Sequence, residues 1–312
     1  MKRIGIIYGD ETSFPQAVAE AINKKGKNVK AEYVKFDVFT IDDSLSYNVI
    51  FDRISNKVEF YRSALKASAL EGTKVVNDPF FACADDNFFN AALASKLKIK
   101  TPKTLILPTK EQPEDTNSST FSNLKYPLDW KRAFDYIGFP AMLKPNRGEA
   151  SYNEYKVYNE HEFFAAYDLS GRHSMILQEY LEHDEYYRCY TIGMNDVKIV
   201  SYNPARPMHT RYSKTEPEID AKLRARIEKI CTKICKAIGF EFNVVEVAVK
   251  AGDVYAVEFL NSAPNADIEY IYEDTFDWLV EKTSDYLIML ANKRKSKPAL
   301  LSRDYSGFDI TG

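Results

Sequence analysis

The sequence predicts an α/β protein with a parallel, helix-covered sheet at its N-terminal end. Strand-like and helix-like segments alternate in the first part of the chain, which is typical of parallel sheets. Near the other end, two apolar strands joined by "KAGD" indicate a β-hairpin. A chain of 312 residues is long for one core and suits two or three packed lobes.

The N-terminal elements follow from the hydrophobic pattern. Residues 3–9, "RIGIIYG", indicate a short buried strand, and residues 13–26 an amphipathic helix that ends at Gly26. Strands are expected in 29–36 and 47–55, with a helix in 58–72. The first strand–helix turn, "YGDETSFP", lacks the later glycines of a dinucleotide fingerprint, which argues against an NAD site of that kind.

The remaining elements alternate less regularly, and the polar stretch 109–127 reads as an exposed loop. Helices are expected in residues 85–99, 129–138, 217–238 and 274–294. Strands are expected in residues 101–108, 140–145, 174–181, 187–204 and 242–261.

Composition narrows the class of protein. The net charge of −3 argues against nucleic acid or an anionic membrane as partner. No apolar run approaches the length of a membrane span or a signal peptide, so we expect a cytoplasmic, reduced protein. Of the four cysteines, Cys231 and Cys235 fall on one apolar helical stripe, and buried thiols are favoured over a metal site because no histidine is near.

Two segments could bind a nucleotide. An apolar strand delivers Lys144, and an ammonium leaving a buried strand needs an acid or an anion such as phosphate as partner. A strand ending in Gln178, Glu179, Tyr180 and Leu181 resembles a hinge whose backbone could bind an adenine edge, with Glu185 placed to accept from ribose hydroxyls. A solvated lysine and an ordinary acidic bend remain the alternatives.

Basic residues follow the hinge in "YYRCY" and "NPARPMHTRY". Arg188, Arg206, His209 and Arg211 lie there, and arginine forks suit carboxylate and phosphate groups. Surface charges paired with the many acids are the other interpretation.

The C-terminal hairpin carries the strongest signal. Glu246 and Glu258 interrupt apolar patterns on adjacent strands, where two acids repel unless a cation or proton lies between them. With Asn261 they form an all-oxygen set, which Mg²⁺ prefers. An edge strand with a solvated acid and a turn asparagine is the alternative.

This order of lysine strand, hinge and acid–acid–asparagine hairpin resembles the ATP-grasp superfamily over nearly the whole chain. The resemblance is strongest to the carboxylate–amine ligases that include ribosomal-protein glutamate ligases and glutathione synthetases. It implies an N-terminal parallel-sheet domain and two lobes that clasp the nucleotide. The expected domains are residues 1–100, 101–181 and 182–312.

The resemblance also implies roles for the candidate residues. Lys144 would bind ATP phosphates, Gln178 to Leu181 adenine and Glu185 ribose. Mg²⁺, with Mn²⁺ as an alternative, would be held by Glu246, Glu258 and Asn261. ATP would phosphorylate a small carboxylate substrate, and an amine or thiol would displace phosphate, while Arg188, Arg206 or Arg211 stabilise the acylphosphate.

Three departures from the family pattern qualify this picture. Asp86 of the usual Asp-Lys pair is kept, but Asn87 replaces the lysine. The phosphate-covering loop "NRGEASYNEY" has a single glycine. Asn261 is three positions beyond Glu258 rather than two, so it needs a bulge or a place past the strand's end.

Two further functions fit the same nucleotide site. One is an ATP-binding regulatory or partner protein that has lost ligase activity, and the other is a small-molecule kinase that phosphorylates a hydroxyl. Small enzymes of this kind often form symmetric dimers, so a homodimer is also an expectation.

Overall fold

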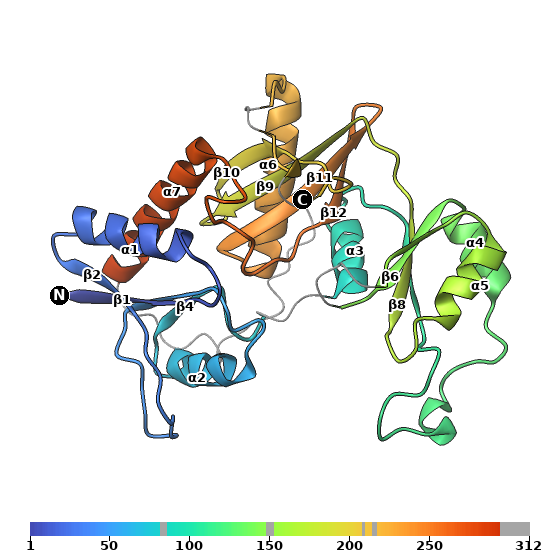
Figure 1. The fold of residues 1–312 in the computed structure, drawn as a ribbon, viewed down its shortest axis with the longest axis horizontal. Coiled ribbons are helices and arrows are strands. Elements are labelled where there is room, and N and C mark those ends of the chain that lie inside the picture. Colours follow the sequence, from blue (N-terminus) through green and yellow to red (C-terminus); the bar gives the residue numbers. More distant parts are fainter. Residues whose placement is uncertain (82–85, 148–152, 208–209, 214–216, 294–312) are drawn as a thin grey trace. The chain divides into compact units, whose positions relative to one another are not determined.

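The computed structural model describes residues 1–81, 86–147, 153–207, 210–213 and 217–293 (Figure 1). The chain forms two compact units. The larger unit takes Met1–Ala84, Glu185–Val247 and Phe259–Gly312, and the smaller takes Asp85–Asp184 and Ala248–Glu258. The division into three domains at residues 100 and 181 stays a prediction.

The first sheet of the larger unit is parallel throughout, as predicted. Its strands β1 (Lys2–Ile7), β2 (Val29–Tyr33), β3 (Val49–Asp52) and β4 (Lys74–Val76) are arranged in the order β2-β1-β3-β4. All four residues of β3 are buried, and its first three, Val49 to Phe51, are apolar as expected for a strand covered on both faces.

Three helices cover this sheet. Helices α1 (Phe14–Lys25) and α7 (Glu273–Asn292) lie on one side and α2 (Glu59–Leu70) on the other (Figure 1). Helix α1 buries Phe14, Val18 and Ile22 on one stripe and ends at Gly26, as expected.

The second sheet contains the predicted hairpin. Its strands β9 (Glu185–Ile192), β10 (Asp196–Ser201), β11 (Phe242–Lys250) and β12 (Asp253–Glu258) are arranged in the order β10-β9-β11-β12. The hairpin turns at Ala251 and Gly252, whose φ angles of 49° and 77° are those of a tight primed turn.

Within the larger unit, an aromatic core joins the parallel sheet to the start of β11. Phe14, Phe51 and Phe242 pack ring against ring, with centroids 5.3 to 6.3 Å apart. Such pairs add to the apolar burial that holds the unit together.

Helix α6 (Ala221–Ile238) begins later than residue 217, where the sequence predicts it. The Asp220 side chain accepts hydrogen bonds from the N–H groups of Lys222 and Leu223, so it caps the helix at that point. The buried face of α6 includes Cys231 and Cys235, as expected, and burial raises the pKa of Cys235 to about 12. Cys83 lies outside the described residues.

The smaller unit contains an antiparallel sheet. Its strands β5 (Thr104–Leu107), β6 (Ala141–Pro145), β7 (Tyr155–Val157) and β8 (Met175–Glu179) are arranged in the order β5-β8-β6-β7. Strand β8 is therefore central, and β6 pairs directly with it.

Helices α4 (Trp130–Ile137) and α5 (Glu160–Asp168) pack side by side in this unit (Figure 1). Trp130, Phe134 and Phe163 are in ring contact in its core, where Leu143 and Leu177 are also buried. Helix α3 (Asn87–Lys96) precedes β5, and a short 3₁₀ helix (Ser118–Phe121) lies in the predicted loop. Strand β7 and helix α5 were not predicted from the sequence.

Among the described helices, none combines the length and the apolar composition that a membrane crossing requires.

Candidate nucleotide and metal site

Lys144 lies in β6 of the smaller unit and meets a carboxylate. Its Nζ atom donates to Oε1 of Glu258 at 3.1 Å. The lysine side chain is 8% exposed and the glutamate side chain 41%, so the carboxylate keeps a large accessible surface. The acid or anion that a desolvated ammonium requires is therefore present.

Asn87 connects the start of α3 to the strand that carries Lys144. Its Nδ2 donates to the carbonyl of Pro145 at 3.2 Å, and the buried Asn146 accepts from Phe88 N–H through Oδ1 at 2.9 Å. Asp86 caps the same helix by accepting from Phe89 N–H. The Asn87 amide therefore makes a structural contact at the position where the resemblance implied a lysine.

Most residues of the predicted hinge form hydrogen bonds with neighbouring residues of the smaller unit. Glu179 N–H donates to the Lys103 carbonyl at 2.8 Å, and Tyr180 N–H to the Pro140 carbonyl at 3.2 Å. The buried Gln178 side chain donates to Thr104 Oγ1 at 2.9 Å. Within the described part of the chain, Leu181 N–H is the hinge amide without a hydrogen-bond partner.

Sequence reasoning missed Lys156 beside this hinge. Its Nζ lies 3.5 Å from the centroid of the Tyr180 ring, a cation–π contact that fixes the ring. No sequence signal marked it, because strand β7 itself was not predicted. Residues 148–152 of the predicted phosphate-covering loop lie outside the described part of the chain.

In the larger unit, Glu185 is the exposed first residue of β9 and accepts a hydrogen bond from the Tyr187 hydroxyl. Burial of the Tyr187 hydroxyl raises the pKa of Tyr187, and the hydrogen bond to the Glu185 carboxylate raises it further.

Arg188 and Glu246 pair within the larger unit, from neighbouring strands β9 and β11. Arg188 Nη1 is 3.4 Å from Glu246 Oε1, and the Tyr186 hydroxyl donates to Oε2 at 2.7 Å. Both side chains are 11% exposed. A cation therefore accompanies each of the two predicted metal-binding acids: Arg188 for Glu246 and Lys144 for Glu258.

The other predicted arginines follow β10. Arg211 Nη1 donates to the Tyr202 hydroxyl at 3.3 Å, and its Nε donates to the Arg206 carbonyl at 2.8 Å. Arg206 is exposed and contributes to this arrangement through its backbone. The structure thus brings Arg188 and Arg211 together and leaves the Arg206 side chain outside. His209 lies outside the described residues.

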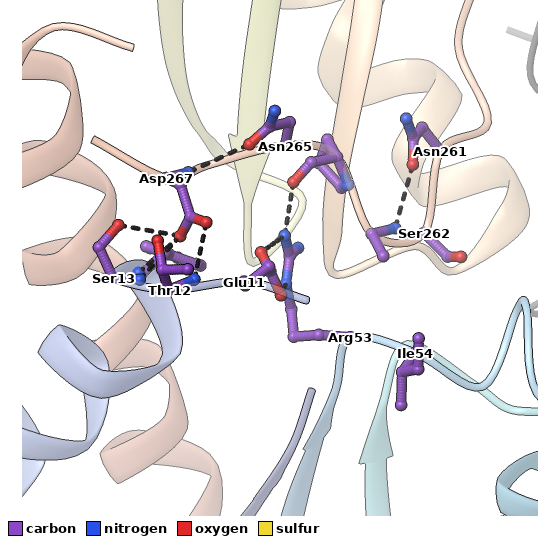
Figure 2. A network of polar contacts seen from close by, with 12 residues as sticks. Glu11, Thr12, Ser13, Arg53, Ile54, Asn261, Ser262, Asn265 and Asp267 are labelled. Carbon is purple, nitrogen blue, oxygen red and sulfur yellow. Dashed lines mark hydrogen bonds and ion pairs between the residues drawn. The ribbon is translucent and has the colours of Figure 1, made fainter. Parts of the chain in front are cut away.

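Asn261 lies past the end of β12, one of the two arrangements that its spacing required. The buried Asn243 holds its backbone: Asn243 Oδ1 accepts from Asn261 N–H at 3.1 Å, and Nδ2 donates to the Phe259 carbonyl at 2.9 Å. Asn261 Oδ1 accepts from Ala263 N–H at 3.1 Å (Figure 2). Asn243 was missed, although an asparagine inside the apolar run "FNVVEV" was a usable signal.

Buried side chains from distant elements hold the loop that follows Asn261. Three of its carbonyls accept from them: Ser262 from Asn77 Nδ2 at 3.3 Å, Pro264 from Arg53 Nη2 at 2.5 Å, and Asn265 from the Tyr190 hydroxyl at 2.7 Å. Arg53 also donates two hydrogen bonds to the Glu11 carboxylate, from Nε to Oε2 at 3.1 Å and from Nη2 to Oε1 at 2.5 Å (Figure 2). Because these donors are buried, the loop backbone is fixed.

Asp267 closes the same loop onto α1. Its carboxylate accepts from the N–H groups of Thr12, Ser13 and Phe14 and from the Ser13 hydroxyl, at 2.9 to 3.1 Å (Figure 2). Burial would raise the pKa of Asp267, but these four donors lower it below 3.8 overall. An acid at a helix N-terminus also complements the helix dipole.

Replacing Asp267 with asparagine is expected to lower the free energy of unfolding by about 2 kcal/mol at pH 7, because charge-assisted bonds are lost. A lowered pKa means that the wild-type carboxylate stabilises the fold above its unfolded pKa and loses this effect as pH falls through its folded pKa. The difference between the two proteins should therefore shrink below pH 3.8.

Urea unfolding of both proteins between pH 7 and pH 3 measures this difference. The matched control is Asp37→Asn, because Asp37 is exposed and accepts only from the neighbouring Val38 N–H in the described residues. A constant difference at every pH would contradict the role of the charge.

The described residues offer oxygen donors for a metal ion in the predicted set, and not as a cluster of acids, histidines or cysteines. Among the described residues, no group of three or more His, Cys, Asp or Glu side chains is placed to hold a metal ion. The predicted set contains two carboxylates and one amide oxygen, which are donors of the kind that Mg²⁺ takes. The metal assignment stays a prediction.

No protein-family model matches the chain. In sequence, the chain is 26% identical over 141 residues to D-alanine–D-alanine ligase A of Bacillus cereus. The match covers 42% of this chain and 46% of the relative, so it spans less than half the length of that protein.

Solved structures match over far more of the chain. D-alanine–D-alanine ligase from Bacillus anthracis complexed with ATP has a TM-score of 0.66 at 20% identity, covering 93% of this chain and 97% of the other. The RimK domain ATP-grasp protein of Sphaerobacter thermophilus has a TM-score of 0.64 at 16% identity, and the match covers 91% of this chain and 98% of the other. The ATP-grasp ligase PsnB, complexed with minimal precursor, Mg and ADP, has a TM-score of 0.60 at 15% identity, and the match covers 93% of this chain and 98% of the other. This chain therefore has the ATP-grasp fold that its sequence predicted.

Proposed function

We propose that this chain is an ATP- and Mg²⁺-dependent carboxylate–amine ligase that forms an acylphosphate. The observation that supports this most is the buried Lys144 ammonium facing the half-exposed Glu258 carboxylate in one unit. A buried cation beside an accessible acid suits the joint binding of phosphates and a metal. The ligase names of the similar proteins support the same reaction class.

The nucleotide is proposed to lie along the smaller unit. Lys144 binds its phosphates, and Leu181 N–H, which has no partner among the described residues, binds the adenine edge. Gln178, Glu179 and Tyr180 shape the hinge. Glu185 accepts from the ribose hydroxyls.

Glu246, Glu258 and Asn261 are proposed to hold Mg²⁺, with Mn²⁺ as an alternative. When bound, the ion neutralises charge on the transferring phosphoryl group. Asn243 fixes the backbone of Asn261, and Tyr186 fixes the carboxylate of Glu246, so two of the three donors are held in place before the ion arrives.

The reaction transfers the γ-phosphoryl group of ATP to a carboxylate oxygen of the acid substrate. An amine then attacks the carbonyl carbon, phosphate leaves, and the amine proton passes to solvent or base. The net products are the amide, ADP and phosphate. Lys144 and the arginines lower the barrier by stabilising charge on the phosphoryl oxygens, and no covalent enzyme intermediate is needed.

We propose an amino acid, a peptide or another small acid as the substrate, with a small amine or thiol as acceptor. The similar proteins bear the names of a D-alanine ligase and of a ligase bound to a precursor, which supports this range. Reduced, buried cysteines fit the cytoplasm, and a homodimer is proposed by analogy alone.

A regulatory ATP-binding protein is the second candidate. The observation that favours it is Asn87, whose amide contacts the Pro145 carbonyl where the family has a lysine for phosphate. Nucleotide binding without any ligation would distinguish it from the ligase.

The first test is thermal stabilisation by ATP alone, by Mg²⁺ alone and by both. At 100 times Kd, a ligand should raise the melting temperature by about 5 °C for a chain of this size. Glu258→Gln should lose most of the shift with Mg–ATP. Glu111→Gln, which changes an exposed acid in the same unit, is the control.

A shift in the wild type justifies a phosphate-release screen with pairs of acids and amines. Release that needs both partners would identify a ligase. If Mg–ATP gives no shift at all, the nucleotide assignment of Lys144 and Glu258 is wrong.

A further inference from the structure

The connection between β2 and β3, residues 34–48, exposes large apolar side chains. Val38 is 83% exposed and Ile41 99%. Phe36 fixes this loop on α2, because the centroid of its ring lies 5.8 Å from that of Phe60 and 5.1 Å from that of Tyr61. Exposed apolar side chains that gather in one place indicate an interaction surface, whereas single ones are ordinary.

Helix α2 extends this apolar surface. Phe60 is 48% exposed and Leu70 47%, and both lie outside the side that α2 buries against the sheet. Two small residues lie between them at helical spacing, so this stripe has no charged member. The stripe consists of Phe60, Ser63, Ala67 and Leu70. We call the stripe and loop 34–48 together the α2 face.

The α2 face differs from the outward faces of the two other long helices of the larger unit. Helix α6 exposes a row of cations and α7 a row of acids, as is typical of helix faces in contact with water. Depletion of charge is instead typical of the core of a protein interface. The charged rows are Lys222, Arg226, Lys229 and Lys233 on α6, and Glu273, Asp277, Glu281 and Asp285 on α7.

Charged side chains of both signs border the α2 face. Asp37, Asp42 and Asp43 are exposed in the loop, and Arg62 and Lys66 lie beside the stripe on α2. Within the described residues, none of these five side chains forms an ion pair. Two copies joined by this face can therefore pair the acids of one copy with the cations of the other.

The stripe has the arrangement that a two-fold axis requires. When two copies of α2 pack antiparallel, Phe60 of one copy meets Leu70 of the other, and Ser63 meets Ala67. The small residues then lie at the centre, where they let the helices approach closely, and the large residues lie at the ends. Such a symmetric contact is closed, so it produces dimers and not filaments.

We propose that the α2 face is the interface of a symmetric homodimer, in which two α2 helices pack antiparallel and each loop 34–48 covers part of the other copy. The homodimer thereby gains a surface of named residues, which is independent of the nucleotide site. Residues 294–312 of the same chain are the competing occupant. A second copy is favoured, because α7, which leads into those residues, lies on the opposite side of the parallel sheet from α2 (Figure 1).

Sedimentation velocity of the full chain at micromolar concentrations is expected to show a dimer. Ile41→Glu should raise the dimer Kd at least tenfold, because the new carboxylate would lose water in the interface. The side chain is 99% exposed in one copy, so the circular dichroism spectrum of the variant should match the wild type. Leu169→Glu is the matched control, because Leu169 is 68% exposed in the smaller unit, and this variant should dimerise like the wild type.

Cysteine cross-linking tests the two-fold arrangement. Ser63→Cys and Ala67→Cys proteins are mixed and oxidised with copper phenanthroline, and we expect disulfide-linked dimers that contain one copy of each. Ser118→Cys, at an exposed position of the smaller unit, is the control and should stay uncross-linked under the same conditions.

The interface is refuted if the wild type is a monomer throughout, or if Ile41→Glu dimerises as tightly as the wild type. A monomer whose Ser63→Cys thiol reacts faster in a chain that stops at Lys293 would also refute it, and would assign the α2 face to the chain's own end. The Mg–ATP thermal shift separates these outcomes from failure of the proposed function. A dimer without a nucleotide shift preserves the interface and removes the nucleotide site, and a nucleotide shift in a monomer does the reverse.

Discussion

Replacing Lys144 with methionine is expected to weaken Mg–ATP binding about thirtyfold while the protein stays folded. The ammonium is nearly buried, so a phosphate that contacts it gains a charge-assisted hydrogen bond with little competition from water. Methionine keeps the unbranched, flexible shape of the side chain and removes the charge.

The folded state should tolerate this change. Glu258 is 41% exposed, so its carboxylate can recover water when the ammonium is gone. We therefore expect a loss of less than about 1 kcal/mol in the free energy of unfolding, in the range of exposed ion pairs. A Lys144 that served only the fold would give the opposite result, with a large loss of stability and unchanged affinity.

Isothermal titration calorimetry with Mg–ATP, together with urea unfolding, measures both quantities. Lys103→Met is the matched control, because Lys103 is an exposed lysine of the same unit. Equal affinity in wild type and Lys144→Met would remove Lys144 from the nucleotide site.

Replacing Asn77 with alanine is expected to lower the free energy of unfolding by about 4 kcal/mol. Asn77 is 2% exposed. Its Oδ1 accepts from the N–H groups of Glu241 and Phe242 at 2.7 and 2.9 Å. Its Nδ2 donates to the carbonyls of Phe242 and Ser262 at 2.6 and 3.3 Å.

Alanine would leave these buried backbone groups without partners, and each unsatisfied group carries a desolvation penalty. The change should appear as a lower urea midpoint in circular dichroism, with Asn195→Ala as control. Asn195 is exposed, and among the described residues its side chain makes one local bond, to the Gly193 carbonyl. A loss of less than about 1 kcal/mol in the free energy of unfolding would contradict this, because it would mean that the freed backbone groups find other hydrogen-bond partners.

The parts of the fold that were predictable depend on local periodicity. The parallel sheet, helix α1 and the β11–β12 hairpin all have apolar patterns bounded by glycine or turn residues. The order of elements with the candidate motifs then led to the ATP-grasp fold. Strand β7 escaped because three residues are too few to show alternation.

Helix α5 was missed although its signal was present. Asn159 accepts from Glu162 N–H, and the Glu162 carboxylate accepts in return from Tyr158 N–H and Asn159 Nδ2. This reciprocal arrangement is similar to a capping box, and a glutamate three positions after an asparagine predicts it.

The supporting residues of the candidate site could not be read from the sequence. Asn77 bonds residues 164 and 165 positions away, and Asp267 bonds residues more than 250 positions away. Such pairings depend on how the chain returns on itself, which no local pattern records. The strand-end residues Lys144 and Glu258, by contrast, stood out because a charge interrupts an apolar run.

The smaller unit cannot be isolated as one continuous fragment. The chain passes between the units four times, after residues 84, 184, 247 and 258. A polypeptide covering residues 85–184 would lack β12 and with it Glu258, the partner of Lys144. Glu246 and Glu258, on consecutive strands, fall on different sides of a unit boundary. Truncation series would therefore yield incomplete folds, and only co-expressed fragments that reassociate could restore the hairpin's connection to both units.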